Sequence, residues 1–104
     1  MKDRVMLSFS CVFSDFELER IYIFYSAEST EIQVDLHGLS CREAERLVRT
    51  IIALIPNDHF SITLIHGFHR GQALKDLFTN TFSNNRVRQT ISHSDNPGRT
   101  TLII

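Results

Sequence analysis

A long apolar stripe between residues 44 and 55 limits the possible folds of this chain more than any other pattern. Its members recur at helical spacing and are Ala44, Leu47, Val48, Ile51, Ile52 and Ile55. The preceding segment SCRE, residues 40–43, has the form of a capping box, in which Ser40 and Glu43 each bond the other's amide. Pro56, Asn57 and Asp58 close the pattern. The sequence therefore predicts an amphipathic helix that begins after Ser40 and ends before Pro56.

Strand patterns flank this helix on both sides. In the segment EIQVDLHG, residues 31–38, Ile32, Val34 and Leu36 alternate with Gln33, Asp35 and His37, and a glycine ends the segment. The second strand pattern contains Phe60, Ile62, Leu64 and Ile65 and ends at His66. A strand, a helix and a second strand in this order form a βαβ unit, so we expect the two strands to be parallel.

The rest of the chain adds a helix and two strands. Leu74, Leu77, Phe78 and Phe82 have helical spacing, and residues 83–85 are expected to end that helix. Strands are expected around residues 87–91 and at 100–104, joined by the turn segment SHSDNPGR. The predicted order from residue 31 is βαβαββ. We therefore expect an α/β fold, a small two-layer sandwich with a mixed sheet.

Residues 1–30 form an extension to this pattern. The segments VMLSFSCVF and RIYIFYS are apolar on both alternating faces, and the acidic segment SDFELE lies between them. We expect two β-strands here, either as a hairpin or as an edge addition to the sheet, with an unstructured leader as the alternative. The predicted organisation is an amino-terminal extension over 1–30 and one domain over 31–104.

Composition and charge exclude several classes of protein. With 42% hydrophobic and 22% charged residues in 104, the chain is expected to be one soluble globular domain rather than a disordered or fibrous one. No apolar run is long enough to cross a membrane. Cys11 and Cys41 have no metal-type spacing, and a secretory leader is lacking, so a cytoplasmic location is expected. Residues 35–104 carry eight basic side chains against six carboxylates, which mildly favours a phosphate-binding surface.

Polar side chains gather where the two parallel strands should end. Asp35 and His37 close the first strand and His66 follows the second. Ligands of open α/β sheets bind at the carboxyl ends of the strands. Asp35 and His37 would share one face of the strand, so the carboxylate could orient the imidazole. A capping role for Asp35 is the alternative. We interpret His59 and His93 as solvated loop residues.

The loop HGFHRG, residues 66–71, has glycines on both sides of three larger residues and precedes a helix. Backbone amides in such a loop can approach a phosphate, Phe68 could stack on a base, and Arg70 could pair with a phosphate. A simple strand-to-helix turn is the alternative, in which Phe68 covers the core. The candidate nucleic-acid contacts are Gly67, Phe68, His69, Arg70, Gly71, Lys75 and Arg99.

Three motifs together resemble the Smr, or small MutS-related, family: VDLHG at 34–38, LIHGFHRG at 64–71 and NPGRT at 96–100. The resemblance covers residues 31–104, and His69 replaces the usual glycine of the loop. It implies a sandwich like the carboxyl-terminal domain of bacterial translation initiation factor three. It also implies a role in nicking DNA or cleaving RNA.

We therefore expect an endonuclease in which His37 and His66 transfer protons or bind the scissile phosphate while Asp35 orients His37. The alternative is a non-catalytic module that binds DNA or structured RNA. It would use the glycine loop with the basic residues Arg70, Lys75, Arg86, Arg88 and Arg99. A protein-interaction role for residues 1–30 is the third hypothesis. We expect no tightly bound metal, although a transient Mg²⁺ or Mn²⁺ between Asp35 and a substrate phosphate is compatible with DNA hydrolysis.

Overall fold

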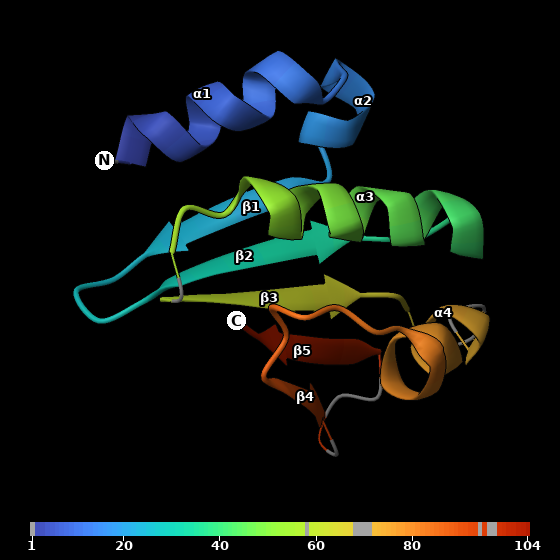
Figure 1. Cartoon of the computed structure of the whole chain (residues 1–104). Helices are drawn as coiled ribbons and strands as arrows, with labels where there is room; N and C mark the ends of the chain where they lie inside the picture. Colours follow the sequence, from blue (N-terminus) through green and yellow to red (C-terminus); the bar gives the residue numbers. More distant parts are fainter. Residues whose placement is uncertain (1, 58, 68–71, 94, 96–97) are drawn as a thin grey trace.

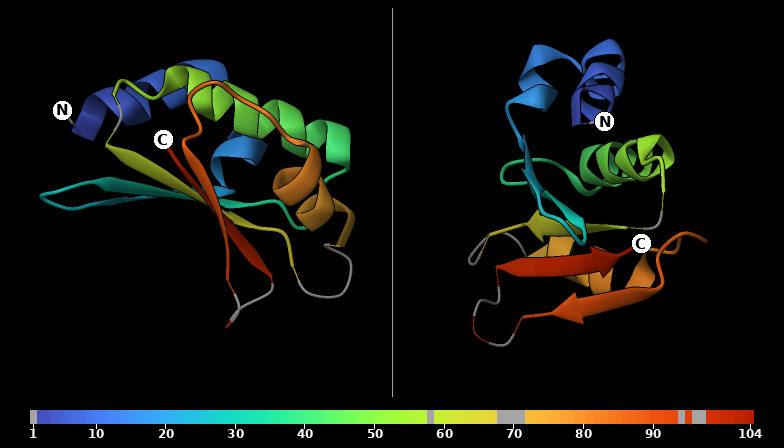
Figure 2. Two further views of the ribbon diagram at one scale, coloured as in Figure 1. Left: turned by 60° about the horizontal axis from the view of Figure 1, so that its bottom comes forward. Right: turned by 90° about the vertical axis from the view of Figure 1, so that its left-hand side faces the viewer.

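Five strands form one mixed sheet in the part of the chain that the computed structural model describes, which is residues 2–57, 59–67, 72–93, 95 and 98–104, with side chains from residue 5 onward. The helices lie on one face of this sheet and leave the other face open (Figures 1 and 2). The elements in chain order are α1 (Lys2–Val12), α2 (Asp15–Leu18), β1 (Ile21–Tyr25), β2 (Thr30–Asp35), α3 (Cys41–Leu54), β3 (Phe60–Ile65), α4 (Gln72–Asp76), the π-helix η1 (Leu77–Thr81), β4 (Gln89–Ser92) and β5 (Arg99–Ile103).

The α3 helix begins and ends as the sequence predicts. Its N-cap is Ser40, whose hydroxyl accepts from the Glu43 amide at 3.1 Å while the Ser40 amide donates to Glu43 Oε1 at 2.9 Å. Hydrogen bonding of the Glu43 carboxyl to the Ser40 amide, and then to the Ser40 hydroxyl, holds the pKa of this carboxyl below its usual 4.5. At the other end, Arg86 Nη1 donates to the carbonyls of Ile52 and Ile55 at 2.7 and 2.8 Å. Side chains therefore satisfy backbone groups at both ends of α3.

The strand order across the sheet is β1-β2-β3-β5-β4. The pair β2 and β3 is parallel, and the pairs β1–β2, β3–β5 and β5–β4 are antiparallel. The strands β2, β3 and β4 consequently run in one direction and end at the same edge of the sheet. The predicted βαβαββ order, the parallel pair and the mixed sheet are confirmed.

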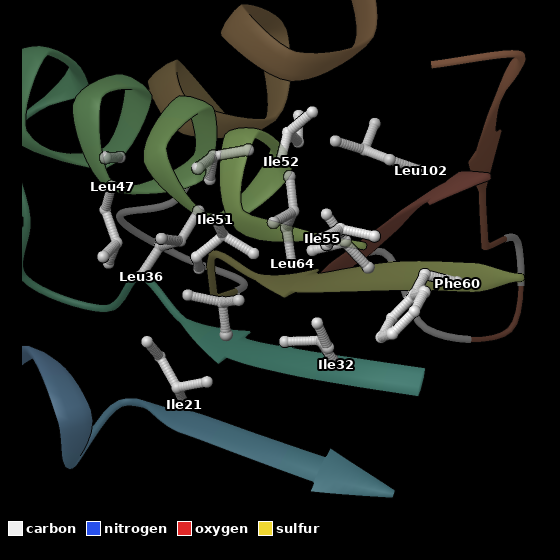
Figure 3. Close-up of a cluster of buried hydrophobic side chains, with 14 of the residues drawn as sticks. Ile21, Ile32, Leu36, Leu47, Ile51, Ile52, Ile55, Phe60, Leu64 and Leu102 are labelled. Atoms are coloured by element: carbon white, nitrogen blue, oxygen red, sulfur yellow. The ribbon is translucent and has the colours of Figure 1, made fainter. Parts of the chain in front are cut away.

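The core lies between α3 and the inward face of the sheet (Figure 3). The apolar stripe of α3 is buried from Ala44 to Ile52, and Ile55 follows it into the core. The strands contribute fully buried side chains on their alternate positions, namely Ile32, Val34, Ile62, Leu64 and Leu102. Burying a side chain of this size stabilises a fold by about 2 kcal/mol. This layer therefore fixes which face of each strand points away from the helices.

The strand predicted within residues 5–13 is wrong, because this segment is part of the helix α1 and the turn after it. Val5, Phe9 and Phe13 are buried, and their spacing of four residues places them on one side of a helix. The intervening Met6 and Leu7 are exposed. A segment that is apolar on every face fits strand and helix periodicities equally well, so the helical pattern is hidden. The edge strand predicted from RIYIFYS is confirmed as β1, antiparallel to β2.

The second predicted helix is interrupted. Its first part, α4, is only five residues long, and the chain then widens into the π-helix η1. The amide of Phe82 donates to the carbonyl of Leu77, five residues back, at 2.7 Å. Phe78 is buried while Phe82 lies half-buried against it, with ring centroids 5.1 Å apart. In the described part of the chain, no helix is both long and apolar enough to cross a membrane.

Candidate functional site

Three histidines follow the ends of the three strands that run in the same direction. His37 comes two residues after β2, His66 directly after β3 and His93 directly after β4. We call this end of the sheet the histidine edge and include in it Gly67, Lys75 and Arg99. The register pairs Asp35 with Ile65 and Ile65 with Arg99, so the ends of β2 and β3 and the start of β5 form one row. The convergence predicted for Asp35, His37 and His66 is therefore present at the level of the backbone.

His66 is buried, and both of its ring nitrogens are engaged. Its side chain is 2% exposed; Nε2 lies 3.0 Å from the Thr100 hydroxyl and Nδ1 lies 3.2 Å from the Gly67 carbonyl. A carbonyl can only accept, so Nδ1 carries the proton and Nε2 accepts from Thr100. Burial lowers the pKa of His66, the Gly67 carbonyl opposes this, and the charge of Lys75 adds to the lowering. His66 therefore behaves as a neutral internal hydrogen-bonding group.

Asp35 has the capping role that was the alternative in the sequence interpretation. Its Oδ1 accepts from the backbone amide of His37 at 2.9 Å, which fixes the chain as it leaves β2. Its side chain lies on the open face, because the alternate positions Val34 and Leu36 are buried under α3. His66 continues the buried positions Ile62 and Leu64 and faces the helices. Asp35 and His66 therefore lie on opposite faces of the sheet.

His37 carries an exposed imidazole at the β2 end of the histidine edge. Its Nδ1 lies 3.7 Å from the point where a side chain on Gly67 would begin. Gly67 has a φ of +88°, which favours glycine. The carbonyls of Asp35 and His37 accept from Arg20 Nη1 at 3.0 and 2.8 Å, which holds the loop that presents the ring. His37 is therefore accessible on a fixed backbone.

The interpretation of His93 as a solvated loop residue is wrong. His93 is half-buried, and its Nε2 lies 2.7 Å from the hydroxyl of Thr101. That hydroxyl lies 3.1 Å from the Thr63 hydroxyl, which donates to Glu31 Oε2 at 2.8 Å. Both threonines are buried, at 3% and 8% exposure. A chain of polar contacts thus runs across the open face from His93 to Glu31.

In this row of polar contacts, the number of available protons decides which group donates and which accepts in each hydrogen bond. A carboxylate only accepts, so the single hydroxyl proton of Thr63 is committed to Glu31. Thr101 must then donate to Thr63, and its oxygen can only accept from His93. The Nε2 of His93 therefore carries a proton. Sequence analysis missed this residue because its partners come from three separate strands.

The basic residues divide into structural and available groups. Arg86 caps α3 and also donates to the Asn57 carbonyl at 3.1 Å, so its guanidinium has a structural role. Lys75 and Arg99 are half-exposed at the histidine edge. Arg88 is exposed but precedes β4, which places it at the opposite edge of the sheet. Among the basic residues that the structure describes, Lys75 and Arg99 are therefore the predicted nucleic-acid contacts that lie at the histidine edge.

The structure describes only the first two residues of the glycine loop, His66 and Gly67. The amide of Gly67 donates to the Gly98 carbonyl at 3.3 Å, so it serves the fold. The predictions for Phe68, His69, Arg70 and Gly71 lie outside the described residues. Across the described ranges, no group of three or more His, Cys, Asp or Glu side chains is arranged to hold a metal ion. A cavity of ≈ 300 Å³ lies at the opposite edge and is lined by residues including Val5, Tyr25 and His59.

No family model, curated protein or solved structure matches this chain. The Smr resemblance therefore stays a prediction that depends on the motifs around Asp35, His66 and Arg99.

Proposed function

We propose that this chain is an RNA-binding module that holds the phosphodiester backbone at its histidine edge. The observation that carries the proposal is the exposed imidazole of His37, held on a fixed backbone beside the side-chain-free Gly67. Lys75 and Arg99 supply positive charge at the same edge. The Smr-like motifs support the proposal, because two of them supply His37, Gly67 and the loop that follows.

The arrangement suits contact with a chain of phosphates. Binding to phosphates releases counterions, so the affinity falls with salt in proportion to the number of contacts. A lysine or arginine that contacts one phosphate contributes about one unit to the slope of log affinity against log salt concentration. Lys75 and Arg99 should each contribute in this way.

The binding test is fluorescence anisotropy with a labelled RNA hairpin, titrated at several salt concentrations. We expect Lys75→Ala and Arg99→Ala to weaken binding and each to reduce the salt slope by about one. Arg88→Ala is the matched control, because it removes an exposed arginine from the opposite edge. Equal weakening by all three variants would remove the histidine edge from the binding surface. A DNA hairpin of the same sequence, measured in parallel, tests whether binding depends on the 2′-hydroxyl.

RNA cleavage is the second candidate function, and the position of His93 at the same edge as His37 favours it. Of the two imidazoles at one edge, His37 and His93, one could take the proton of the RNA 2′-hydroxyl as it attacks the adjacent phosphorus, and the other could protonate the 5′-oxygen that leaves. Asp35 would act through the backbone of His37, and His66 would maintain the fold. This assignment replaces His66 with His93 in the pair that the sequence suggests.

The cleavage test incubates the purified protein with the same RNA, with and without EDTA, and resolves the products on a gel. We expect His37→Ala and His93→Ala each to reduce the rate by about a hundredfold or more. His59→Ala is the matched control, because His59 is exposed before β3, at the opposite edge. Asp35→Asn retains the acceptor for the His37 amide and should retain most of the activity. Cleavage that survives both histidine substitutions would refute this assignment. Binding without cleavage would leave the proposed function intact.

A further inference from the structure

Exposed apolar side chains gather in one part of the chain. The large exposed hydrophobic residues among the described positions all lie between residues 6 and 24, namely Met6, Leu7, Val12, Phe16, Tyr22 and Phe24. Two of them, Tyr22 and Phe24, are each 51% exposed and lie on the open face of β1, which is the edge strand of the sheet. Exposed apolar side chains that are gathered in one place are typical of an interaction site, whereas scattered single ones are common on any protein surface.

The hydrogen-bond pattern shows which backbone groups of β1 point outward. The Asp35 amide donates to the Arg20 carbonyl at 2.8 Å, and the Ser26 amide donates to the Ser29 carbonyl at 3.0 Å. Arg20 and Ser26, the residues immediately before and after β1, are therefore both hydrogen-bonded across the hairpin, and both have even numbers. Bonded pairs alternate along an antiparallel ladder, so Tyr22 and Phe24 direct their backbone groups toward β2. Ile21 and Ile23 direct theirs away from the sheet, where no further strand pairs with β1 in the described part of the chain.

We propose that β1 pairs with β1 of a second copy of this chain, antiparallel and around a two-fold axis at Ile23. In this register Ile23 lies opposite the partner's Ile23, and Tyr22 lies opposite the partner's Phe24. The outward groups of the two Ile23 residues then meet as a bonded pair, which exchanges both N–H···O bonds across the two-fold axis. The even-numbered residues form the close non-bonded pairs, so Tyr22 and Phe24 stack in two equivalent aromatic contacts on the open face.

A second copy fits this edge for three reasons. The segment IYIFY has no charge, proline or glycine, so nothing in it repels an identical strand. The other edge strand, β4, is shorter and has mostly exposed polar positions, as expected of an edge that is protected against pairing. Apolar side chains are also exposed on both sides of this edge: Tyr22 and Phe24 on the open face, and Phe16 of α2 with Met6, Leu7 and Val12 of α1 on the side of the helices.

The test uses sedimentation velocity over a wide range of protein concentration, with the full chain and two variants. We expect the wild type to form dimers in a concentration-dependent way. Tyr22→Glu and Phe24→Lys each place a charge opposite an aromatic ring twice per dimer, and each should weaken the dimer by about tenfold or more. Both sites are half exposed, so circular dichroism should show an unchanged fold.

Mixing the two variants tests the register itself. In the mixed dimer, the introduced carboxylate lies opposite the introduced ammonium, and the remaining Tyr22 lies opposite the remaining Phe24. We therefore expect the mixture to dimerise more strongly than either variant alone, and added salt should reduce this gain. A wild type that is monomeric at every concentration overturns the proposal. So does a dimer that neither substitution weakens, or a mixture that shows no gain.

Amide hydrogen exchange gives a measurement that needs no variant. The Ile23 amide points outward, so its exchange should slow as the protein concentration rises, whereas the Tyr22 amide should be protected at all concentrations. An Ile23 amide whose exchange does not change with concentration contradicts the pairing. This inference does not depend on RNA binding, because neither measurement contains RNA.

Discussion

Acidification should destabilise this fold through His66. The buried ring donates from Nδ1 to the Gly67 carbonyl and accepts at Nε2 from Thr100. Burial lowers the pKa of His66 from its ordinary 6.5, and the Lys75 charge lowers it further against the opposing effect of the Gly67 carbonyl. A second proton on the ring would also remove the acceptor that the Thr100 hydroxyl uses. The folded state therefore binds this proton less readily than the unfolded state.

The sign and size of the effect follow from this difference. Above pH 6.5, the ordinary pKa of the imidazole, the ring is neutral in both states and the full stability is present. As the pH falls below that value, the unfolded chain takes up the proton first, so the free energy of unfolding decreases. One proton changes this free energy by at most about 1.4 kcal/mol per pH unit. The decrease ends once the pH falls below the lowered pKa of the folded state.

Urea denaturation at about pH 7.5, 6.5 and 5.5 measures this dependence. We expect His66→Gln to lose the part of the slope that His66 causes, whatever its effect on stability at neutral pH. Thr100→Val should cost about 1 kcal/mol at neutral pH but retain a titrating ring. The lowered pKa of Glu43 acts below 4.5, outside this range. A His66→Gln variant with the same pH slope as the wild type would refute the reasoning.

Two further substitutions test the site. Thr101→Val breaks the polar contacts between His93 and Glu31 and should lower the free energy of unfolding by about 1–2 kcal/mol in urea denaturation, whereas Thr101→Ser should retain most of the stability. Nitrogen NMR of the His93 ring should show a proton on Nε2 in the wild type. A ring protonated mainly on Nδ1 would contradict the donors and acceptors given above. Gly67→Ala and Gly38→Ala both place a side chain at a positive φ, +88° and +82°, and should each cost about 1 kcal/mol. The alanine at 67 also meets the His37 ring, so RNA affinity should fall only in Gly67→Ala, and equal affinities would argue against a role for this contact.

The elements that could be predicted from the sequence are those with local signals. The α3 helix has a capping box at Ser40 and Glu43 and a regular apolar stripe, and both are present in the structure. The strands β2 and β3 alternate cleanly, which gave their parallel pairing through the βαβ rule. The helix α1 had no such signal, because apolar residues such as Met6 and Leu7 occupy its exposed side.

The candidate site could be located from the sequence but its roles could not be assigned. The ends of β2 and β3 were enough to bring His37 and His66 to one edge. The burial of His66 depends on Thr100, which is 34 residues away in the chain. The placement of His93 likewise depends on Thr101 and on the strand order of the sheet. Contacts of this kind are set by tertiary structure and leave no local pattern.

The first thirty residues shape the histidine edge as well as the proposed dimer. Val5, Phe9, Phe13 and Ile21 belong to the same buried cluster as the α3 stripe. Arg20 reaches from the residue before β1 to the carbonyl of Asp35, which ends β2, and to that of His37, two residues further on. Removing residues 1–30 would therefore expose part of the core and release the loop that carries His37. For this reason, the role of this segment is better tested by single substitutions on the exposed side of β1 than by truncation.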